Sequence, residues 1–444
     1  MAEREEGMKE TLTSSNTRQK AAFVFMFLWA FAYFRPAYWS GVQAVKYACY
    51  GIKLAGIWWI VWKEVLKFMP EGVSRRISDL LCKSFHTEER LKCGVLPMDG
   101  LCRRKAAWGL GWKTKWNRYD GLVLAIGALV LASGVRNTEV AIETGKNAFY
   151  FMLMYFGMRK MLMQEEDIRR SLFHGFMCYF VLMSLISTIF ILAVGGQSYG
   201  HYFFWGSDNG MANNYFFAVF LAYIDAAFDK KRVSLLFILA AASAVVYAFT
   251  LQVGAAMLWV LGGGVFAVLF CIPSKMLLKI MDLSHLLIGF LLLWLSIFVS
   301  RWPLMENLIN KIFYGKYSSI TSRAKLWEYF LGRSLSHPLL GYGSSAVKYQ
   351  SLPEGIDKWK LIGNCHNICV ETIYHYGYAV FLLLLVLIFL AAGRLRKQGR
   401  KYVYLGVFFF LYLLHGLVES GINYSFLYLP LMYYAEKMER QNER

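Results

Sequence analysis

The chain has 444 residues, of which 57% are hydrophobic and only 17% are charged. Soluble domains usually contain about 45–50% apolar and about 25% charged residues, so this composition excludes a soluble protein of two or three ordinary domains. The formal net charge of +19 comes largely from basic runs between apolar segments. Such runs are typical of the cytoplasmic loops of membrane proteins and do not by themselves indicate a nucleic-acid partner, so we expect none.

The N-terminal part predicts a cytoplasmic tail followed by a helical hairpin. Residues 1–20 are polar and mixed in charge, whereas residues 21–34 are apolar and precede a second apolar stretch that ends at Trp62. Ala30 and Ala32 also give an A-x-A pattern, so a cleaved signal peptide is the alternative. We expect the hairpin, because the apolar core of a signal peptide would begin unusually late in this chain.

Two lysines interrupt the second apolar stretch. Lys46 and Lys53 are seven residues apart, so they share one face of the predicted helix. Lysines that face the interior of a helical bundle would suit an anionic ligand, whereas lysines near the membrane surface extend their amines into water. The sequence leaves both interpretations open.

The polar segment 63–118 contains candidates of two kinds. Three tryptophans at spacing four predict one face of a helix, which either lies on the membrane surface or packs under the bundle. Four further residues have side chains that bind zinc, but they lack the paired Cys-x-x-Cys spacing, so reduced cytosolic thiols are the preferred interpretation. The tryptophans are Trp108, Trp112 and Trp116, and the possible zinc ligands are Cys82, His86, Cys93 and Cys102.

Ten further apolar segments each approach the length of about 20 residues that a helix needs to cross a bilayer. With the N-terminus inside, Lys and Arg cluster in every cytoplasmic linker, as the positive-inside rule requires, and the long linker 301–366 is the exception among the outer ones. The sequence therefore predicts an all-α integral membrane protein of about 12 transmembrane helices, with both termini cytoplasmic. The ten segments are 119–135, 144–158, 171–195, 211–228, 233–250, 253–272, 280–300, 367–392, 402–418 and 423–436.

The predicted parts follow from these segments. A cytoplasmic tail (1–20) precedes transmembrane helices one to nine (21–300), and helices ten to twelve (367–436) precede a second cytoplasmic tail (437–444). Between helices nine and ten we expect a large, partly helical extracytoplasmic loop (301–366). Most spans carry no charge at their centres, which disfavours a transporter.

The outer loop contains most of the residues that are candidates for catalysis or ligand binding. A stretch with basic and aromatic residues at helical spacing predicts an amphipathic helix, and a Pro-x-x-Gly-x-Gly sequence then predicts a tight turn. A His-Asn pair opens the apolar run that returns to the membrane. These residues are Arg323, Trp327, Phe330, Pro338, Gly341, Gly343, His366 and Asn367.

In their order and position these residues resemble the O-antigen ligase and O-antigen polymerase superfamily of bacterial envelopes. The detailed match covers 323–377, and the polar stretch 203–214 before the sixth span is similar to a family loop. The chain departs from the family at Gln252, because the family often has a Ser-Arg pair at the turn between spans seven and eight. Arg301 and Arg136 are the nearest outer arginines that would replace this missing cation.

The resemblance implies a glycosyltransferase of the plasma (inner) membrane that polymerises or ligates glycan in surface-polysaccharide biosynthesis (O-antigen, capsule or exopolysaccharide). Its donor would be an undecaprenyl-pyrophosphate-linked glycan, and its acceptor a hydroxyl of a second glycan or lipid-linked molecule at the extracytoplasmic face. The donor sugar is already activated, so we expect no cofactor and no catalytic metal. The chain accordingly contains no P-loop and no Asp-x-Asp pair.

The resemblance also implies roles for single residues. His366 is the expected general base, because an imidazole titrates near ambient pH. Arg323 is expected to bind the donor pyrophosphate, because a guanidinium group pairs with phosphate oxygens in a bidentate manner. Asn367, Glu371 and Trp327 are supporting residues, with Glu371 as a charge partner for the histidine. The simpler roles are helix capping for His366, a lipid-headgroup or salt-bridge contact for Arg323, and packing for Trp327.

Two other classes of function stay open. A lipid-linked oligosaccharide flippase or another transporter would need no outer histidine, and a non-catalytic envelope assembly protein would explain the Arg missing at Gln252. Within the enzyme class, the motif does not separate a ligase from a polymerase, and we favour the polymerase. His337 and His375 lie outside the motif and are expected to be surface or core histidines.

Overall fold

All regular secondary structure in the described part of the chain is helical, which confirms the all-α class. Two compact units are present, one formed by Met1–Lys53 with Leu122–Arg444 and the other by Leu54–Gly121. The candidate sites lie in the first unit. The computed structural model describes residues 2–36, 39, 41–68, 118–135, 139–194, 204–206, 210–229, 232–251, 253–271, 275–299, 317–344, 365–395, 400–417, 419 and 424–442.

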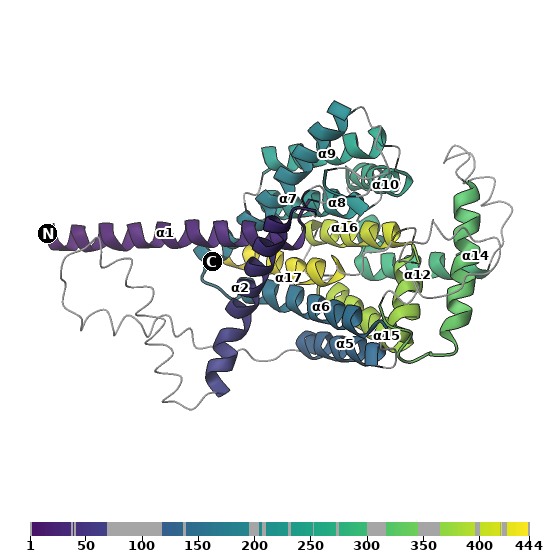
Figure 1. The fold of residues 1–444 in the computed structure, drawn as a ribbon. Helices are drawn as coiled ribbons and strands as arrows, with labels where there is room; N and C mark the ends of the chain where they lie inside the picture. Colours follow the sequence, from purple (N-terminus) through teal and green to yellow (C-terminus); the bar gives the residue numbers. More distant parts are fainter. Residues whose placement is uncertain are drawn as a thin grey trace. The chain divides into compact units, whose positions relative to one another are not determined.

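A helix stands at every predicted apolar segment (Figure 1), and the first one also includes most of the polar residues 1–20. The predicted span 280–300 corresponds to one helix preceded by a short one, and the outer loop contains the predicted amphipathic helix. The helices are α1 (Ala2–Tyr33), α2 (Gln43–Phe68), α5 (Arg118–Val135), α6 (Ala141–Leu162), α7 (Glu166–Val194), α8 (Gly210–Ile224), the π-helix η4 (Asp225–Asp229), α9 (Leu235–Thr250), α10 (Gly254–Cys271), α11 (Lys275–Ile280), α12 (Leu283–Val299), α14 (Tyr317–Ser334), α15 (Ile368–Leu395), α16 (Arg400–Gly416) and α17 (Ser425–Asn442).

Three of the described helices are long and apolar enough to cross a membrane. They are the segments Arg118–Val135, Glu166–Ala193 and Ile368–Leu395, in α5, α7 and α15. Shorter apolar stretches occur in α9, α10, α12 and α16. The membrane character is therefore supported by length and composition, whereas the count of twelve spans and the side on which the outer loop lies stay predictions.

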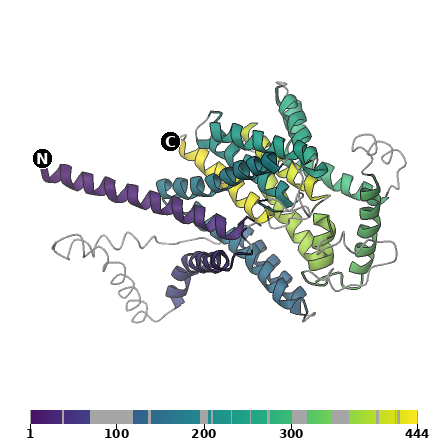
Figure 2. The ribbon, with the colours of Figure 1, turned by 45° about the horizontal axis from the view of Figure 1, so that its top comes forward.

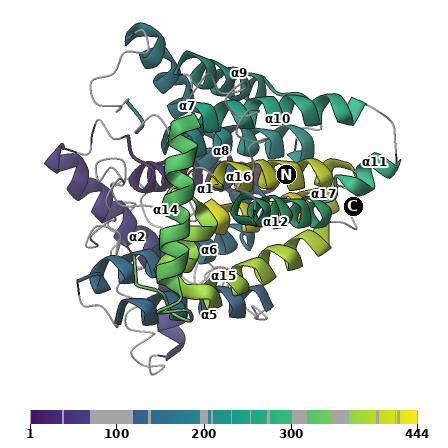
Figure 3. The same cartoon turned by 90° about the vertical axis from the view of Figure 1, so that its right-hand side faces the viewer.

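The centre of the first unit is α8, which is apolar on every face and buried along nearly its whole length. It packs against α7, α9, α10 and α16 (Figure 3). The ring of Tyr215 stacks on Tyr247 of α9 at 4.3 Å between centroids, and Phe216 stacks on Trp259 of α10 at 4.0 Å. A helix that is hydrophobic all round needs neighbours on all sides, and these stacked rings supply the contacts.

The C-terminal half of α1 packs along α7. Phe27 contacts the ring of Tyr179 edge to face, and Trp29 contacts Phe176. Figure 2 shows the N-terminal part of α1, in purple, extending away from these contacts. The apolar segment of α1 is thus the part that the first unit buries.

One end of the helical bundle gathers basic side chains, and we call it the basic end. Here Arg170 pairs with Asp229, Arg394 pairs with Glu436, and Lys401 lies 5.9 Å from the ring centroid of Phe228. The ends of α7, η4, α15, α16 and α17 therefore meet. The predicted cytoplasmic linkers 159–170, 229–232 and 393–401 begin or end at this group.

The other end holds the predicted catalytic residues, and we call it the His366 end. It joins the start of α15, the end of α16 and the start of α6 through the contacts described below. Figures 1 and 3 show α14 lying across the ends of its neighbours rather than along them, and it packs against α15 and α12. The end of this transverse helix leads into the loop motif, which therefore lies against α15, the helix that begins beside His366.

Candidate functional site

The turn that follows α14 forms backbone hydrogen bonds with the first half of α15. The N–H groups of Tyr342 and Gly343 donate to the carbonyls of Tyr374 and His375, at 2.9 and 2.7 Å. In return, the N–H of Tyr378 donates to the carbonyl of Pro338 at 2.7 Å. The Pro-x-x-Gly-x-Gly motif is therefore a turn, as predicted, and its partner is the helix that begins beside His366.

Gly377 makes this pairing possible, because it interrupts the helical dihedrals of α15 at φ 84° and ψ 169°. In an unbroken helix, Tyr378 would donate to the carbonyl of Tyr374. The break frees that carbonyl for the turn, and only glycine adopts such dihedrals readily. Gly341 and Gly343 also have positive φ, at 63° and 87°. Three glycines thus fix the turn against α15.

Trp327 anchors α14 to the segment before α15. Its side chain is 2% exposed, and its indole Nε1 donates to the carbonyl oxygen of Cys365 at 2.9 Å. Phe330 packs beside it, with its ring centroid 4.6 Å from that of Tyr374. The packing role expected for Trp327 therefore agrees with its surroundings, and the indole positions the residue directly before His366.

His366 lies between Cys365, which Trp327 contacts, and Asn367 at the start of α15. Among the described non-glycine residues it alone has positive φ, at 49°. This conformation costs about 1–2 kcal/mol for most residues, and such strained residues cluster at functional sites. Its Nδ1 lies 3.2 Å from Oε2 of Glu419, and the two side chains are 20% and 9% exposed. A largely buried carboxylate thus faces one ring nitrogen of the expected base.

Asn367, not His366, caps α15. Its Oδ1 accepts hydrogen bonds from the N–H groups of Cys369 and Val370 at 3.0 and 3.1 Å, which is the N-cap arrangement. Its Nδ2 donates to the carbonyl of Leu417 at 3.0 Å and joins α15 to the end of α16. The capping role considered for His366 therefore belongs to its neighbour, and the supporting role expected of Asn367 has a physical basis.

Because Asn367 occupies these N–H groups, they offer little to an anion. A pyrophosphate bound here would depend on basic side chains. Arg323 lies in α14 one helical turn before Trp327, and its side chain is outside the described part. Arg301, Arg136 and Gln252 are also outside the described residues. The predicted cation sites therefore stay predictions.

Glu371 points toward a different histidine from the one expected. Its Oε1 lies 3.9 Å from Nδ1 of His375, one turn later on α15, whereas the carboxylate facing His366 belongs to Glu419. His375 is 2% exposed, as expected of a core histidine. One sequence signal marks Glu419, because it is the single acidic residue between the apolar stretches of α16 and α17.

Cys365 is buried and does not offer a nucleophile. Burial, with a smaller effect of Glu371, raises the pKa of its thiol well above the ordinary value, so the sulfur stays protonated. Cys365 and Cys369 are both free thiols in the structure.

A polar network connects α6 to the turn and to α15. The N–H of Ser344 donates to Thr144 Oγ1 at 2.8 Å, and its hydroxyl lies 2.8 Å from the hydroxyl of Tyr376. Asn147 donates to the same serine at 2.9 Å. No sequence pattern singled out these residues. The network holds α6 beside the site and gives the His366 end a second polar patch.

The remaining candidate residues do not belong to the His366 end. Lys53 donates to the hydroxyl of Tyr150 at 3.3 Å, and its amine lies 4.8 Å from the ring centroid of Tyr33. Aromatic rings therefore surround this amine, in a cation–π arrangement that neither earlier interpretation included. The possible zinc ligands and the tryptophans of 63–118 lie outside the described residues.

No protein-family model, curated protein or solved structure matches this chain. The candidate function therefore depends on the motif and on the geometry of the His366 end. Chemically, that end offers an imidazole with one nitrogen held by a carboxylate. When Nδ1 donates its proton to that carboxylate, Nε2 carries the lone pair that a general base requires.

Proposed function

We propose that this chain is an integral-membrane glycosyltransferase of the plasma membrane. It would transfer glycan from an undecaprenyl-pyrophosphate carrier to an acceptor hydroxyl at the extracytoplasmic face, in the synthesis of a surface polysaccharide. The observation that carries the proposal is the His366–Glu419 pair at the start of α15. The pair lies at the start of the helix to which the motif turn is hydrogen-bonded, so the turn, Trp327 and His366 belong to one end of the bundle.

The reaction we propose is a single displacement at the anomeric carbon. Nε2 of His366 takes the proton of the acceptor hydroxyl while the acceptor oxygen forms a bond to that carbon. The bond from the carbon to the carrier pyrophosphate breaks, and the pyrophosphate leaves with the electron pair. Arg323 would stabilise the charge that develops on it. The donor already contains a good leaving group, so neither nucleotide nor metal takes part.

The two ends of the bundle support the proposed orientation. The basic end would be cytoplasmic by the positive-inside rule, and the His366 end would then be extracytoplasmic. In this orientation the chain spans the membrane about 12 times, and α14 lies in the outer loop above the donor headgroup. Substrate carried by undecaprenyl pyrophosphate would reach the site from the surrounding lipid.

Glu419 is expected to position His366 for this reaction. Glu419→Gln removes the charge but keeps the size, so we expect kcat to fall about 10–100-fold with little change in KM. Glu419→Asp should restore part of the rate. Glu139, an exposed acidic residue just before α6, supplies the matched control Glu139→Gln. Steady-state kinetics of glycan transfer measure both constants, and an equal loss in the control would contradict a positioning role.

The function itself is tested with purified wild-type protein in nanodiscs. The assay supplies undecaprenyl-pyrophosphate-linked repeat units with a chelator and without nucleotide. We expect a ladder of products whose new linkages have inverted anomeric configuration. A single mobility shift of an added acceptor would identify a ligase instead. Retained configuration would overturn the single displacement. No product from any donor, together with accelerated flipping of the lipid-linked glycan in vesicles, would overturn the enzyme in favour of a transporter.

A further inference from the structure

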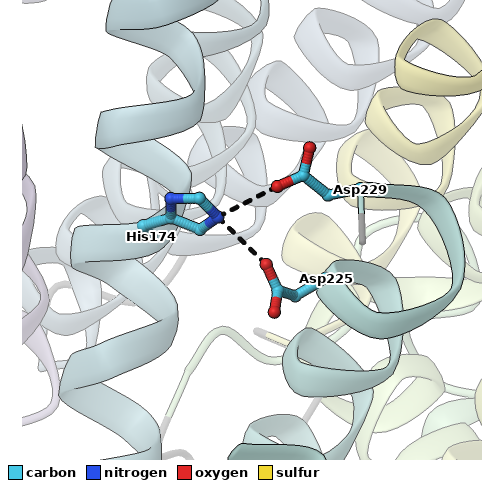
Figure 4. Close-up of side chains that lie close together, drawn as sticks. All are labelled: His174, Asp225 and Asp229. Carbon is cyan, nitrogen blue, oxygen red and sulfur yellow. Dashed lines mark hydrogen bonds and ion pairs between the residues drawn. The ribbon is translucent and has the colours of Figure 1, made fainter. Parts of the chain in front are cut away.

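Three side chains with metal-binding atoms converge at the basic end, far from His366. Nε2 of His174 lies 3.0 Å from Oδ1 of Asp225 and 3.3 Å from Oδ2 of Asp229 (Figure 4). One ligand atom from each residue lies within 4.8 Å of the other two. His174 is on α7, and both aspartates are on η4, so two separate elements of the bundle supply the group.

We propose that His174, Asp225 and Asp229 form a binding site for a divalent transition-metal cation of the Zn²⁺ type. The bonds of Zn²⁺ to imidazole nitrogen and carboxylate oxygen are about 2.0–2.2 Å long. Ligand atoms on neighbouring corners of a tetrahedron or octahedron around such an ion are then about 3.0–3.5 Å apart. The two distances from Nε2 fall in this range, and the mixed nitrogen and oxygen set favours a transition metal over Mg²⁺ or Ca²⁺.

The position of the imidazole nitrogen favours a cation over a simple ion pair. Nε2 faces two carboxylate oxygens from different residues, yet one N–H of a protonated imidazole directs its hydrogen well toward only one of them. A metal ion would bond to all three atoms at once. With a metal ion, all three ligand atoms form bonds. With a proton on Nε2 instead, only one of the two carboxylate oxygens accepts a well-aligned hydrogen bond.

The surroundings orient the ligands and leave a path to them. Nε of Arg170 lies 3.4 Å from Oδ1 of Asp229, so the other oxygen of that carboxylate is the one facing the imidazole. Such outer contacts commonly fix the orientation of metal ligands. The side chain of Asp225 is fully buried, whereas that of His174 is 32% exposed. A cation would enter past the histidine and would keep one or more coordination positions for water.

The π-helical turn explains why the two aspartates act together. Asp225 and Asp229 are the first and last residues of η4, which directly continues α8. Single π-turns within helices are rare and occur frequently at functional sites. Here the turn presents both carboxylates to α7, and a metal would therefore connect α7 to the end of the buried helix α8.

This site is separate from the proposed reaction. It lies near Tyr434 of α17, whose ring packs on Phe173 at 4.8 Å, and α17 in turn reaches the C-terminal end of α15 through Glu436 and Arg394. His366 precedes the opposite end of α15, a helix of 28 residues. The cation would thus stabilise the bundle at the basic end and would take no part at the anomeric carbon.

The test measures metal binding by chelator-treated, full-length protein. We expect one equivalent of Zn²⁺ per chain at this site, retained on dialysis and counted by mass spectrometry, and unaffected by excess Mg²⁺ or Ca²⁺. The variants His174→Gln and Asp225→Asn should each weaken binding at least tenfold. Because 82–102 contains possible zinc ligands, Cys82→Ser and Cys93→Ser are the matched controls, and they should leave this equivalent in place.

A spectroscopic measurement on the wild type keeps the test independent of whether the variants fold. Co²⁺ bound by one nitrogen and two carboxylates gives weak visible bands without the strong near-ultraviolet absorption of cobalt–thiolate bonds. That spectrum in the wild type supports the proposal, and its loss in His174→Gln would assign the bands to this site. Thiolate absorption lost only in Cys93→Ser would overturn it, because the metal would then belong to the cysteine segment. Absence of saturable Zn²⁺ and Co²⁺ binding by the wild type would also overturn it.

Discussion

His366→Ala is expected to lower kcat/KM for glycan transfer by about 10²–10⁴-fold, the range that a general base usually contributes. The acceptor hydroxyl is a weak nucleophile, and without an imidazole its proton has no acceptor at the moment of attack. Binding of the lipid-linked donor should change little, because the expected pyrophosphate contacts come from arginine. The loss should therefore appear mainly in kcat, measured by the rate of product formation at saturating donor.

Two further variants separate base chemistry from structure. His366→Gln keeps a polar side chain of similar size near Glu419 but cannot serve as the base, so it should be nearly as inactive as the alanine variant. His285→Gln changes a histidine whose side chain is 45% exposed at the start of α12 and should keep full activity. Wild-type rates in both His366 variants would remove the proposed mechanism while leaving the fold intact.

The sequence predicted the helices well because apolar length is a local property. Each apolar segment stands on a helix in the described part of the chain, and the turn at Pro338, Gly341 and Gly343 follows from residues within six positions of one another. The helix cap was predicted only in part. The His-Asn pair was correctly placed at the start of α15, but which of the two residues caps the helix depends on the direction of their side chains. That direction became visible only with the backbone in place.

The partners of the site residues were not predictable in the same way. Glu419 lies 53 positions after His366, and Asp225 lies 51 positions after His174. Helix packing brings these pairs together, and no short-range spacing records it. Glu371 was the expected partner of His366 because it is near in sequence, yet within a helix it faces the residue one turn later. Proximity along the chain therefore predicted the wrong partner for His366, because helix packing determines which carboxylate lies beside it.

The strongest structural test concerns Gly377, where the turn and α15 meet. Gly377→Ala is expected to destabilise the His366 end by about 2–5 kcal/mol, from backbone strain and from lost hydrogen bonds. At φ 84° an added Cβ would overlap the carbonyl oxygen of Leu339 and lie 2.6 Å from the backbone nitrogen of Leu340. Both are backbone atoms that cannot rotate away, so the turn must separate from α15.

Hydrogen exchange measures this separation directly. The amides of Tyr342, Gly343 and Tyr378 donate the hydrogen bonds that join the turn to α15, and in Gly377→Ala their protection should fall by about 30-fold or more. Gly393→Ala is the matched control on the same helix, because nothing lies within 4 Å of its added Cβ. In the control, the free energy of unfolding should rise by up to about 1 kcal/mol, because alanine has a higher helix propensity than glycine.

Unchanged protection in Gly377→Ala would show that the turn does not depend on this break. Lost protection with lost activity would instead mean that the glycine break in α15 holds the base in place.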